Sequence, residues 1–214
     1  DRAGVAAVWN AIDQHPGAMP GTRVRTFRVR HKNGTDRYRR FMAVSLSDEQ
    51  LLVTLLDITE RKLAMEQLRK LSLAVEQSPE SIVITDTSAR IEYVNDAFVR
   101  NSGYARAELI GRNPRILNNG ATPLATYQDL WATLLRGEVW RGEFHNARKD
   151  GTPFIELATL APIRNANGAV THYVGVKEDI TLRRRSEELV HRLAYYDPLT
   201  GLPNRAMLRD RLQH

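Results

Sequence analysis

Alternating apolar and polar positions predict a β-hairpin near the middle of the chain. In "SIVITDTSARIEYVND" a short apolar run leads to a turn at Asp86–Ser88, and a second run follows in which Ile91 and Tyr93 alternate with polar residues. Two short helical stretches come next, with Gly103 and Gly111 placed to end them. This part of the chain is therefore predicted to form two strands and then short helices.

A longer helix and three more strands are predicted to follow. The segment "ATYQDLWATLLRGE" spaces Tyr127, Leu130, Leu134 and Leu135 close to one helix face, and Gly137 marks its end. Three strand-like runs come after it, "WRGEFHNARKDG", "TPFIELATLAPIRNANG" and "AVTHYVGVKEDIT", separated by turn residues. The whole order predicts an α+β fold with helices on one face of a sheet.

An internal repeat organises the chain. "VWNAI" resembles "LWATL", which places Trp9 and Trp131 122 positions apart, and "LLDITERK" resembles "KEDITLRR", which gives the same spacing for Asp57 and Asp179. Between these anchors, "RHKNGTDRY" resembles "ARKDGTPFI" with an offset of 117. An early part-domain therefore repeats the back half of a later, whole one.

Each "DIT" segment is followed by apolar residues at helical spacing. Asp57 and Asp179 stand just before these stretches, where a carboxylate can accept backbone N–H bonds, and Thr181 ends the second segment. Alternating steps of three and four predict a short parallel coiled-coil seam between two copies of the chain, with a helix packed on its own domain as the alternative. The seam positions are Ala64, Leu68, Leu71 and Val75, and then Leu182, Ser186, Leu189, Leu193 and Tyr196.

Composition narrows the class of protein. Lys and Arg number 31 against 25 Asp and Glu, a net charge of +6, but the basic residues of "RVRTFRVRHK" alternate with apolar ones as in a solvated strand. We therefore expect no nucleic-acid partner. The chain has no cysteine, which excludes disulfides and thiol chemistry. It has no apolar run of about 18 residues, so we expect no membrane span and a cytoplasmic location. No two histidines have metal-ligand spacing and no catalytic pair is marked, so we expect neither a metal site nor catalysis within these segments.

The segments together resemble a PAS domain. The landmarks are "SPESIVITDTSARIEYVNDAFVRNSGYARAELIGRNPRILNNG", "RKDGT", "PIRNANG" and "HYVGVKEDIT". The resemblance implies a five-stranded antiparallel sheet with flanking helices and a pocket that suits a planar ligand. The expected segments are 1–59, the C-terminal part of a first PAS domain; 60–76, a signalling helix; 73–181, a complete second PAS domain; 182–196, another signalling helix; and 197–214, the start of a further domain.

Part of the predicted pocket resembles flavin-binding PAS domains. "IGRNPRILNNG" resembles the helix that carries a reactive cysteine in the light-sensing subfamily, but Pro114 stands at that position, so no photoadduct can form. Asn146 matches an asparagine that binds the flavin edge in these relatives. Asn113 and Arg115 match positions near the flavin tail.

Two further positions depart from the light sensors. Glu156 stands where they have a second asparagine, and Lys177 stands where they have glutamine. This combination resembles the redox-sensing PAS domains that hold FAD in nitrogen-fixation regulators. Trp131 would then pack near the flavin ring system, although it can equally be a core aromatic, as Asn146 can be a strand-end residue. A haem is not favoured, since His145 and His172 are predicted in strands.

The segment "YDPLTGLPNR" carries a second resemblance, to the start of a GGDEF domain, commonly written D-x-LTGLxNR. The resemblance implies that the full-length protein is a diguanylate cyclase, a cyclic di-GMP phosphodiesterase with a GGDEF domain, or both. The metal-binding aspartate and the GGDEF signature lie downstream of this start, so this stretch is expected to sense and transmit as a homodimer. A ligand-free PAS dimerisation module is the alternative. The matching positions are Asp197, Leu199, Thr200, Gly201, Leu202, Asn204 and Arg205.

Overall fold

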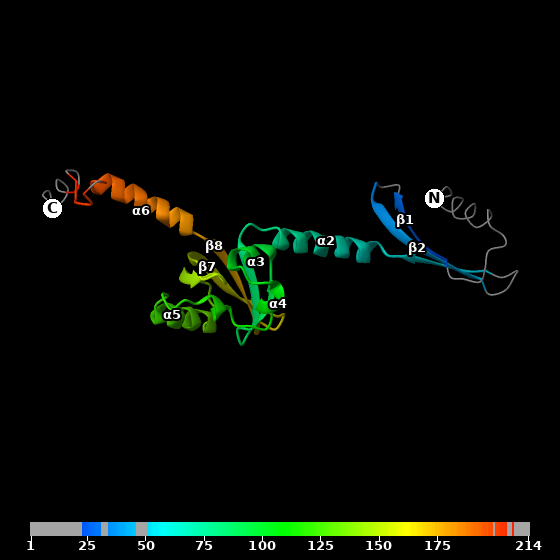
Figure 1. Cartoon of the computed structure of the whole chain (residues 1–214). Helices are drawn as coiled ribbons and strands as arrows, with labels where there is room; N and C mark the ends of the chain where they lie inside the picture. The colour runs from blue at the N-terminus through cyan, green and yellow to red at the C-terminus, as the bar shows by residue number, and fades with distance from the viewer. Residues whose placement is uncertain (1–22, 31–33, 46–50, 199, 205–206, 208–214) are drawn as a thin grey trace. The chain divides into compact units, whose positions relative to one another are not determined.

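The chain forms two compact units that meet between residues 72 and 73. The structure is a computed structural model, and it describes residues 23–30, 34–45, 51–198, 200–204 and 207 (Figure 1). The predicted position Trp9 and the matched positions Leu199 and Arg205 lie outside the described residues.

The second unit is built on a five-stranded antiparallel sheet with the order β5-β4-β8-β7-β6. The predicted hairpin forms its first two strands, because β4 and β5 pair across the turn that begins at Asp86. The three later strands pair in sequence order, so β8 lies in the centre between β4 and β7. The predicted α+β fold is therefore confirmed. The strands are β4 (Ser81–Asp86), β5 (Ile91–Val94), β6 (Trp140–Ala147), β7 (Pro153–Arg164) and β8 (Val170–Asp179).

Short helices lie beside this sheet between β5 and β6 (Figure 1). The backbone of Gly103 has a φ of 75°, a left-handed conformation that glycine adopts at low cost, and its N–H donates to the Val99 carbonyl to end the first of them. Leu135 was predicted on the apolar face of the long helix, but it is 76% exposed, because the helix buries Leu130 and Leu134 instead. The helices are α3 (Asp96–Ser102), α4 (Arg106–Leu109), the 3₁₀ helix η1 (Pro114–Leu117), α5 (Leu124–Leu135) and, after the sheet, α6 (Thr181–Tyr195).

Two apolar clusters fill the second unit. Strand residues alternate between a buried and a less buried face, as the pattern of β4 shows, so one face of the sheet supplies most of the core. The first cluster joins α3 and η1 to the sheet and contains Val83, Ile91, Val94, Phe98, Leu109, Leu117 and Phe154. The second joins α5 to the sheet and contains Leu130, Leu134, Trp140, Phe144, Ala158 and Tyr173.

The first unit contains a three-stranded antiparallel sheet with the order β1-β2-β3. A long helix, α2 (Thr59–Glu76), begins in this unit and ends in the second. The strands are β1 (Arg23–Arg30), β2 (Asp36–Ser45) and β3 (Leu51–Asp57).

The strand register of this small sheet repeats that of β6, β7 and β8. Arg30 pairs with Asp36 as Ala147 pairs with Pro153, at the offset of 117 found in the sequence. The β2–β3 pairing is repeated as well, because 39 pairs with 57 as 156 pairs with 179, at the sequence offsets of 117 and 122. The sequence repeat is thus matched by an equal pairing geometry in the two sheets.

Candidate ligand site and helix junctions

Three polar side chains lie buried side by side on three adjacent strands of the second unit. Asn146, Glu156 and Lys177, named here the buried triad, are only 4%, 3% and 5% exposed. Glu156 Oε2 accepts a hydrogen bond from Asn146 Nδ2 at 2.8 Å and forms an ion pair with Lys177 Nζ at 2.9 Å. The structure therefore brings these three predicted site residues together, and it pairs the buried charges that would otherwise be costly.

The ammonium group of Lys177 lies where the two apolar clusters meet. Its Nζ is 5.6 Å from the ring centroid of Phe98, in the first cluster, and 5.6 Å from that of Phe144, in the second. A cation at this distance from two ring faces is attracted by both. The triad therefore faces the interior between α3 and the sheet.

The first unit provides an internal comparison for the triad. By the shared strand register, its positions correspond to Val29, Arg39 and Leu55 in the small sheet. None of the three reproduces the triad's residue, yet the strands there pair in the same way. Strand pairing therefore does not require the triad.

The segment after η1 holds the outer edge of β6 beside the triad. Asn118 forms a bridge with Asn146, and Asn119 Nδ2 donates to the Asn146 carbonyl at 3.1 Å. Thr122 Oγ1 accepts from the N–H of His145 at 2.8 Å and donates to its carbonyl at 3.0 Å. These contacts cover an edge strand and fix the backbone of Asn146. Sequence reasoning missed them, although "NNG" ends the predicted pocket segment "IGRNPRILNNG".

The other predicted cofactor residues are Asn113, Arg115 and Trp131, and they contact residues other than the triad. Asn113 caps η1 by accepting the N–H of Arg115 at 3.0 Å, and the Arg115 side chain is exposed. Trp131 is 37% exposed and meets the ring of Tyr173 edge-on at 5.9 Å. The described contacts of these three side chains include none with the triad.

Asn95 joins the end of α2 to the second unit. It is fully buried, and its Oδ1 accepts the N–H groups of Ile82 at 2.9 Å and Phe98 at 3.0 Å. Its Nδ2 donates to the carbonyls of Val75 at 3.1 Å and Glu80 at 2.9 Å. The amide thus uses two donors and two acceptor positions, and it caps α3 while holding the last turn of α2.

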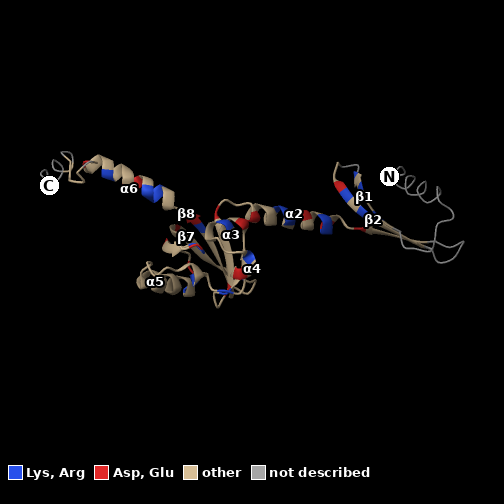
Figure 2. Ribbon diagram, in the orientation of Figure 1, with Lys and Arg blue, Asp and Glu red and all other residues tan. Residues whose placement is uncertain are grey.

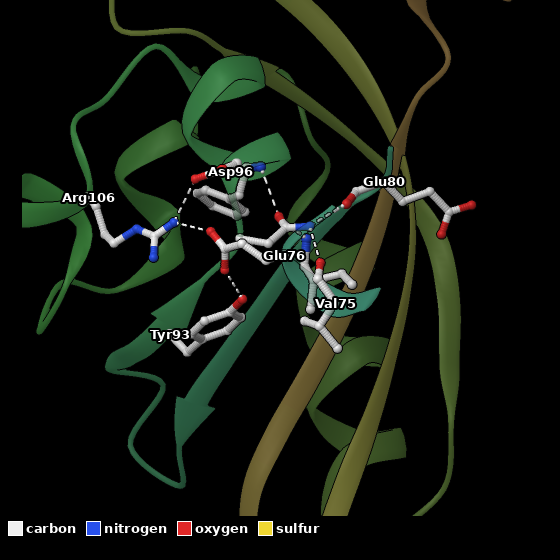
Figure 3. Close-up of polar contacts among 9 residues, drawn as sticks. Val75, Glu76, Glu80, Tyr93, Asp96 and Arg106 are labelled. Carbon is white, nitrogen blue, oxygen red and sulfur yellow. Dashed lines mark hydrogen bonds and ion pairs between the residues drawn. The ribbon is translucent and has the colours of Figure 1, made fainter. Parts of the chain in front are cut away.

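Glu76, the last residue of α2, also bonds to the second unit beside Asn95 (Figure 3). One carboxylate oxygen accepts from the hydroxyl of Tyr93 on β5, and the other pairs with Arg106 on α4, which also contacts Asp96 at 2.9 Å. The hydrogen bonds from Tyr93 and Arg106 lower the pKa of Glu76 to about 2. Burial and the bond to Glu76 raise the pKa of Tyr93 to about 12. We call the contacts of Asn95 and Glu76 the incoming junction.

The start of α6 is held by a second set of contacts, the outgoing junction. Asp179 Oδ1 accepts from the N–H of Thr181 at 2.9 Å and from its hydroxyl at 2.6 Å. Asp179 Oδ2 pairs with Arg148 at 2.5 Å, and Thr181 Oγ1 accepts the N–H of Ile155 at 2.9 Å. Burial alone would raise the pKa of Asp179, but the bonds from Thr181 and Arg148 hold it below its usual value.

The first "DIT" segment repeats this geometry. Asp57 Oδ1 accepts from the N–H of Thr59 at 3.0 Å and from its hydroxyl at 2.5 Å. Thr59 Oγ1 in turn accepts the N–H of Tyr38 at 2.9 Å, as Thr181 does for Ile155. Each "DIT" segment therefore locks the start of its helix to the neighbouring strand.

Helix α3 contacts both junctions and the triad. Its N-cap Asn95 belongs to the incoming junction, and the carbonyl of Asn101 near its other end accepts from Arg148 of the outgoing junction. Phe98 lies between these ends and faces Lys177. A single helix of seven residues thus links α2, α6 and the candidate site.

The predicted seam residues of α6 are exposed. Leu182, Leu189 and Leu193 are 77%, 57% and 58% exposed, and the described residues of α6 include no buried side chain. The helix therefore does not bury this side against its own unit. Acidic and basic residues are interspersed along α2 and α6 (Figure 2).

The segment after α6 folds back on the end of that helix. Asn204 donates from Nδ2 to the carbonyl of Ala194 at 2.8 Å, and its N–H donates to the carbonyl of Tyr195 at 2.9 Å. Asp197 Oδ1 accepts the N–H and the hydroxyl of Thr200 at 2.8 and 2.9 Å. Several residues matched to the GGDEF start therefore build a compact loop.

Neither a metal-binding cluster nor a membrane-spanning helix is found in the described part of the chain. No group of three or more His, Asp or Glu residues there is arranged to hold a metal ion. No helix among the described residues has the length and apolar character needed to cross a membrane.

Comparison with known proteins finds a family match for part of the second unit. Residues 79–182 match the PAS domain family. The chain is 39% identical over 114 residues to a nitrogen fixation regulatory protein of Klebsiella oxytoca, covering 53% of this chain and 23% of that one. It is 33% identical over 97 residues to the aerotaxis receptor of Escherichia coli K12, covering 45% and 19%. Residues 79–182 therefore belong to the PAS domains, a class of sensory domain found in signal-transduction regulators.

Solved structures agree with the fold. A light-oxygen-voltage domain, described as "Flavin Analogue Sheds Light on Light-Oxygen-Voltage Domain Mechanism", is 30% identical with a TM-score of 0.50, covering 57% of this chain and 93% of that chain. An RNA-binding light-oxygen-voltage receptor has a TM-score of 0.53 at 17% identity, covering 88% and 86%, and shows the fold alone. The chain spans about a quarter of the length of the nitrogen fixation regulatory proteins that it matches.

Proposed function

We propose that the PAS domain of this chain is a sensor that binds a flavin at the buried triad. The observation that carries the proposal is the triad itself, a charged pair and an amide buried between two apolar clusters. The small sheet keeps the same register with Val29, Arg39 and Leu55 at these positions. A buried ion pair is costly and is not needed for strand pairing, so it is better explained by recognition of a ligand.

The chemistry of the triad suits a flavin ring system. A flavin has an apolar ring face and an edge that carries both hydrogen-bond donors and acceptors. Asn146 offers both, Lys177 offers donors and Glu156 an acceptor, while Phe98 and Phe144 supply apolar surface beside them. When bound, a flavin would supply reversible two-electron chemistry. A relative described with a flavin analogue, at 30% identity, supports this ligand class.

Among flavins we propose FAD. Pro114, Glu156 and Lys177 depart from the pattern of the light sensors and resemble the redox-sensing domains, and a nitrogen fixation regulatory protein is 39% identical over 114 residues. Asn113 and Arg115 are proposed to lie near the FAD tail, and Trp131 near the ring system.

Transmission is proposed to run through the outgoing junction into α6. Its start is fixed by Asp179, Thr181 and Arg148, and α3 connects this junction to Lys177 through Phe98. The exposed apolar residues of α6, spaced alternately three and four positions apart, support a homodimer. In it the α6 helices of two chains would pack against each other. A change at the site would then shift the rotation or register of the pair.

The output is proposed to be cyclic di-GMP signalling in the cytoplasm. The residues 197–214 resemble a GGDEF start, and the compact loop after α6 would join that output directly to the helix. The repeated strand register supports a second, partial PAS domain in residues 1–59.

The visible spectrum of the purified chain tests the ligand. We expect flavin absorption and about one flavin per chain after acid extraction, because only the second unit carries the triad. Asn146→Ala should lower the flavin content severalfold, whereas Arg39→Gln, at the equivalent position to Glu156 in the small sheet, should leave it unchanged. A folded, colourless chain that does not bind added FAD would reject the proposal and favour a ligand-free dimerisation module.

A further inference from the structure

We infer that Lys177 makes the site prefer the reduced, anionic form of a flavin over the oxidised, neutral form. The inference rests on the proposed flavin binding and adds which redox form the site selects. It follows from where the two charges of the buried triad lie.

The positive charge of Lys177 lies beside an aromatic ring of each apolar cluster. Lys177 Nζ lies 5.6 Å from the rings of both Phe98 and Phe144, between the helix layer and the sheet. A planar ligand that contacts both apolar clusters would therefore lie beside the ammonium group.

The negative charge of Glu156 is partly neutralised by two hydrogen bonds to one carboxylate oxygen. Glu156 Oε2 accepts two hydrogen bonds, from Asn146 at 2.8 Å and from Lys177 at 2.9 Å. Both donors weaken the electrostatic effect of the carboxylate on a neighbouring ligand. Of the charged side chains that the structure describes, only Lys177 and Glu156 are in the buried class, so nothing else of comparable burial opposes the ammonium.

This field acts differently on the two redox forms. An oxidised flavin that takes up two electrons and one proton gains one negative charge, with the electrons coming from an external reductant such as dithionite. A buried positive charge stabilises the anion more than the neutral ring, because interactions are strong where water is excluded. The bound flavin should therefore be easier to reduce than free flavin.

The chain contains a closely matched control pair at its surface. Lys149 pairs with Glu108 at 2.6 Å and its Nζ lies 5.6 Å from the ring of Tyr104, but both charged side chains are nearly half exposed. Lys149→Gln therefore removes an ion pair and a cation–π contact of the same kind outside the site.

The test is the midpoint potential of FAD bound to the whole chain, measured by reduction with dithionite beside a reference dye. Lys177→Gln should shift the equilibrium at least tenfold toward oxidised flavin, which is about 30 mV for a two-electron couple. Lys177→Arg keeps the charge and should keep the potential near that of the wild type. Glu156→Gln should raise the midpoint potential, and Lys149→Gln should leave the potential unchanged.

The double variant decides which charge dominates and also avoids an unpaired buried charge. Glu156→Gln with Lys177→Gln should give a potential below that of the wild type, and a potential above it would overturn the inference. Bound flavin whose potential is the same in Lys177→Gln and wild type would overturn the inference while leaving flavin binding intact. A wild-type chain that binds no flavin would instead reject the proposed function, and the inference with it.

Discussion

The side-chain amide of Asn95 lies 3.1 Å from the main-chain carbonyl of Val75. One fully buried residue thereby caps α3 and holds the last turn of α2. The helix that enters the PAS domain is thus fastened to the same short helix that faces Lys177.

Replacing Asn95 should destabilise the PAS domain strongly. Asn95→Ala leaves two buried N–H groups and two carbonyls without their partner, and we expect a loss of about 2–4 kcal/mol in the free energy of unfolding. Asn95→Asp keeps the two acceptor bonds but sets a buried carboxylate against the carbonyls of Val75 and Glu80, so it should cost no less than Asn95→Ala. Urea unfolding, followed by the fluorescence of the buried Trp140, gives the values.

Asn167→Ala, in an exposed turn, is the control for Asn95 and should change stability by less than about 0.5 kcal/mol. Equal effects of the two substitutions would show that the four bonds of Asn95 contribute little.

Glu76 should make the domain sensitive to acid. Its pKa is about 2 in the folded chain, below the ordinary value of 4.5, so its contribution is fully present above about pH 5 and is lost as the pH falls toward 2. The side chain is about a quarter exposed, so screening limits the contribution to roughly 1 kcal/mol. Glu76→Gln should flatten the stability profile between pH 5 and 2.

Glu60→Gln, in the exposed first turn of the same helix, is the matched control for Glu76. Its profile should follow that of the wild type, and a Glu76→Gln profile as steep as the wild type would assign the acid sensitivity to other groups.

The outgoing junction should protect the first turn of α6. Arg148→Gln removes the ion pair with Asp179 and the contact to the Asn101 carbonyl, which together are worth about 1–2 kcal/mol locally. Amides in the first turn of α6 and the last turn of α3 should then exchange with solvent about 5–30-fold faster. Hydrogen exchange followed by mass spectrometry measures both segments.

Arg183→Gln is the control for Arg148, since it breaks a half-exposed pair with Glu178 beside the same helix. If exchange accelerates in α6 but not in α3, the two elements are not coupled through Arg148.

The exposed seam of α6 should hold two copies together. Leu189→Asp places a charge in the middle of the seam and should weaken dimerisation at least tenfold, as measured by sedimentation equilibrium. His191→Asp adds the same charge on the opposite side of the helix and should have little effect. A wild-type chain that is monomeric throughout, or a dimer unaffected by Leu189→Asp, would exclude the seam.

Trp131 should matter for flavin content if it packs near the ring system. Trp131→Ala is then expected to reduce bound flavin severalfold without unfolding the domain, because Trp131 is 37% exposed. Leu135→Ala, at a more exposed position of the same helix, should leave flavin content unchanged. An equal flavin content in both variants would place Trp131 outside the site.

Much of the fold could be predicted because it depends on local patterns. The hairpin after Ser81, the helix stop at Gly137 and the three later strands follow from periodicity and turn residues. Leu135 was misplaced because helical spacing gives an angle around the helix and not the position of the neighbouring sheet.

The candidate site was predicted only in part. Asn146, Glu156 and Lys177 were named from a resemblance, and the structure shows that they contact one another across three strands. Asn95 and Glu76 were missed, because their roles depend on contacts between segments far apart in the sequence. Only "ND" before the helical stretch, a helix-cap signal, indicated Asn95.

The loop closed by Asn204 is held to the end of α6 by two hydrogen bonds. Because Asn204 binds the carbonyls of Ala194 and Tyr195, the loop and the last turn of α6 form one piece. A domain attached here would inherit the angular phase of the helix, which advances by about 100° for each residue. The spacing between α6 and this loop would therefore set the direction in which such a domain faces.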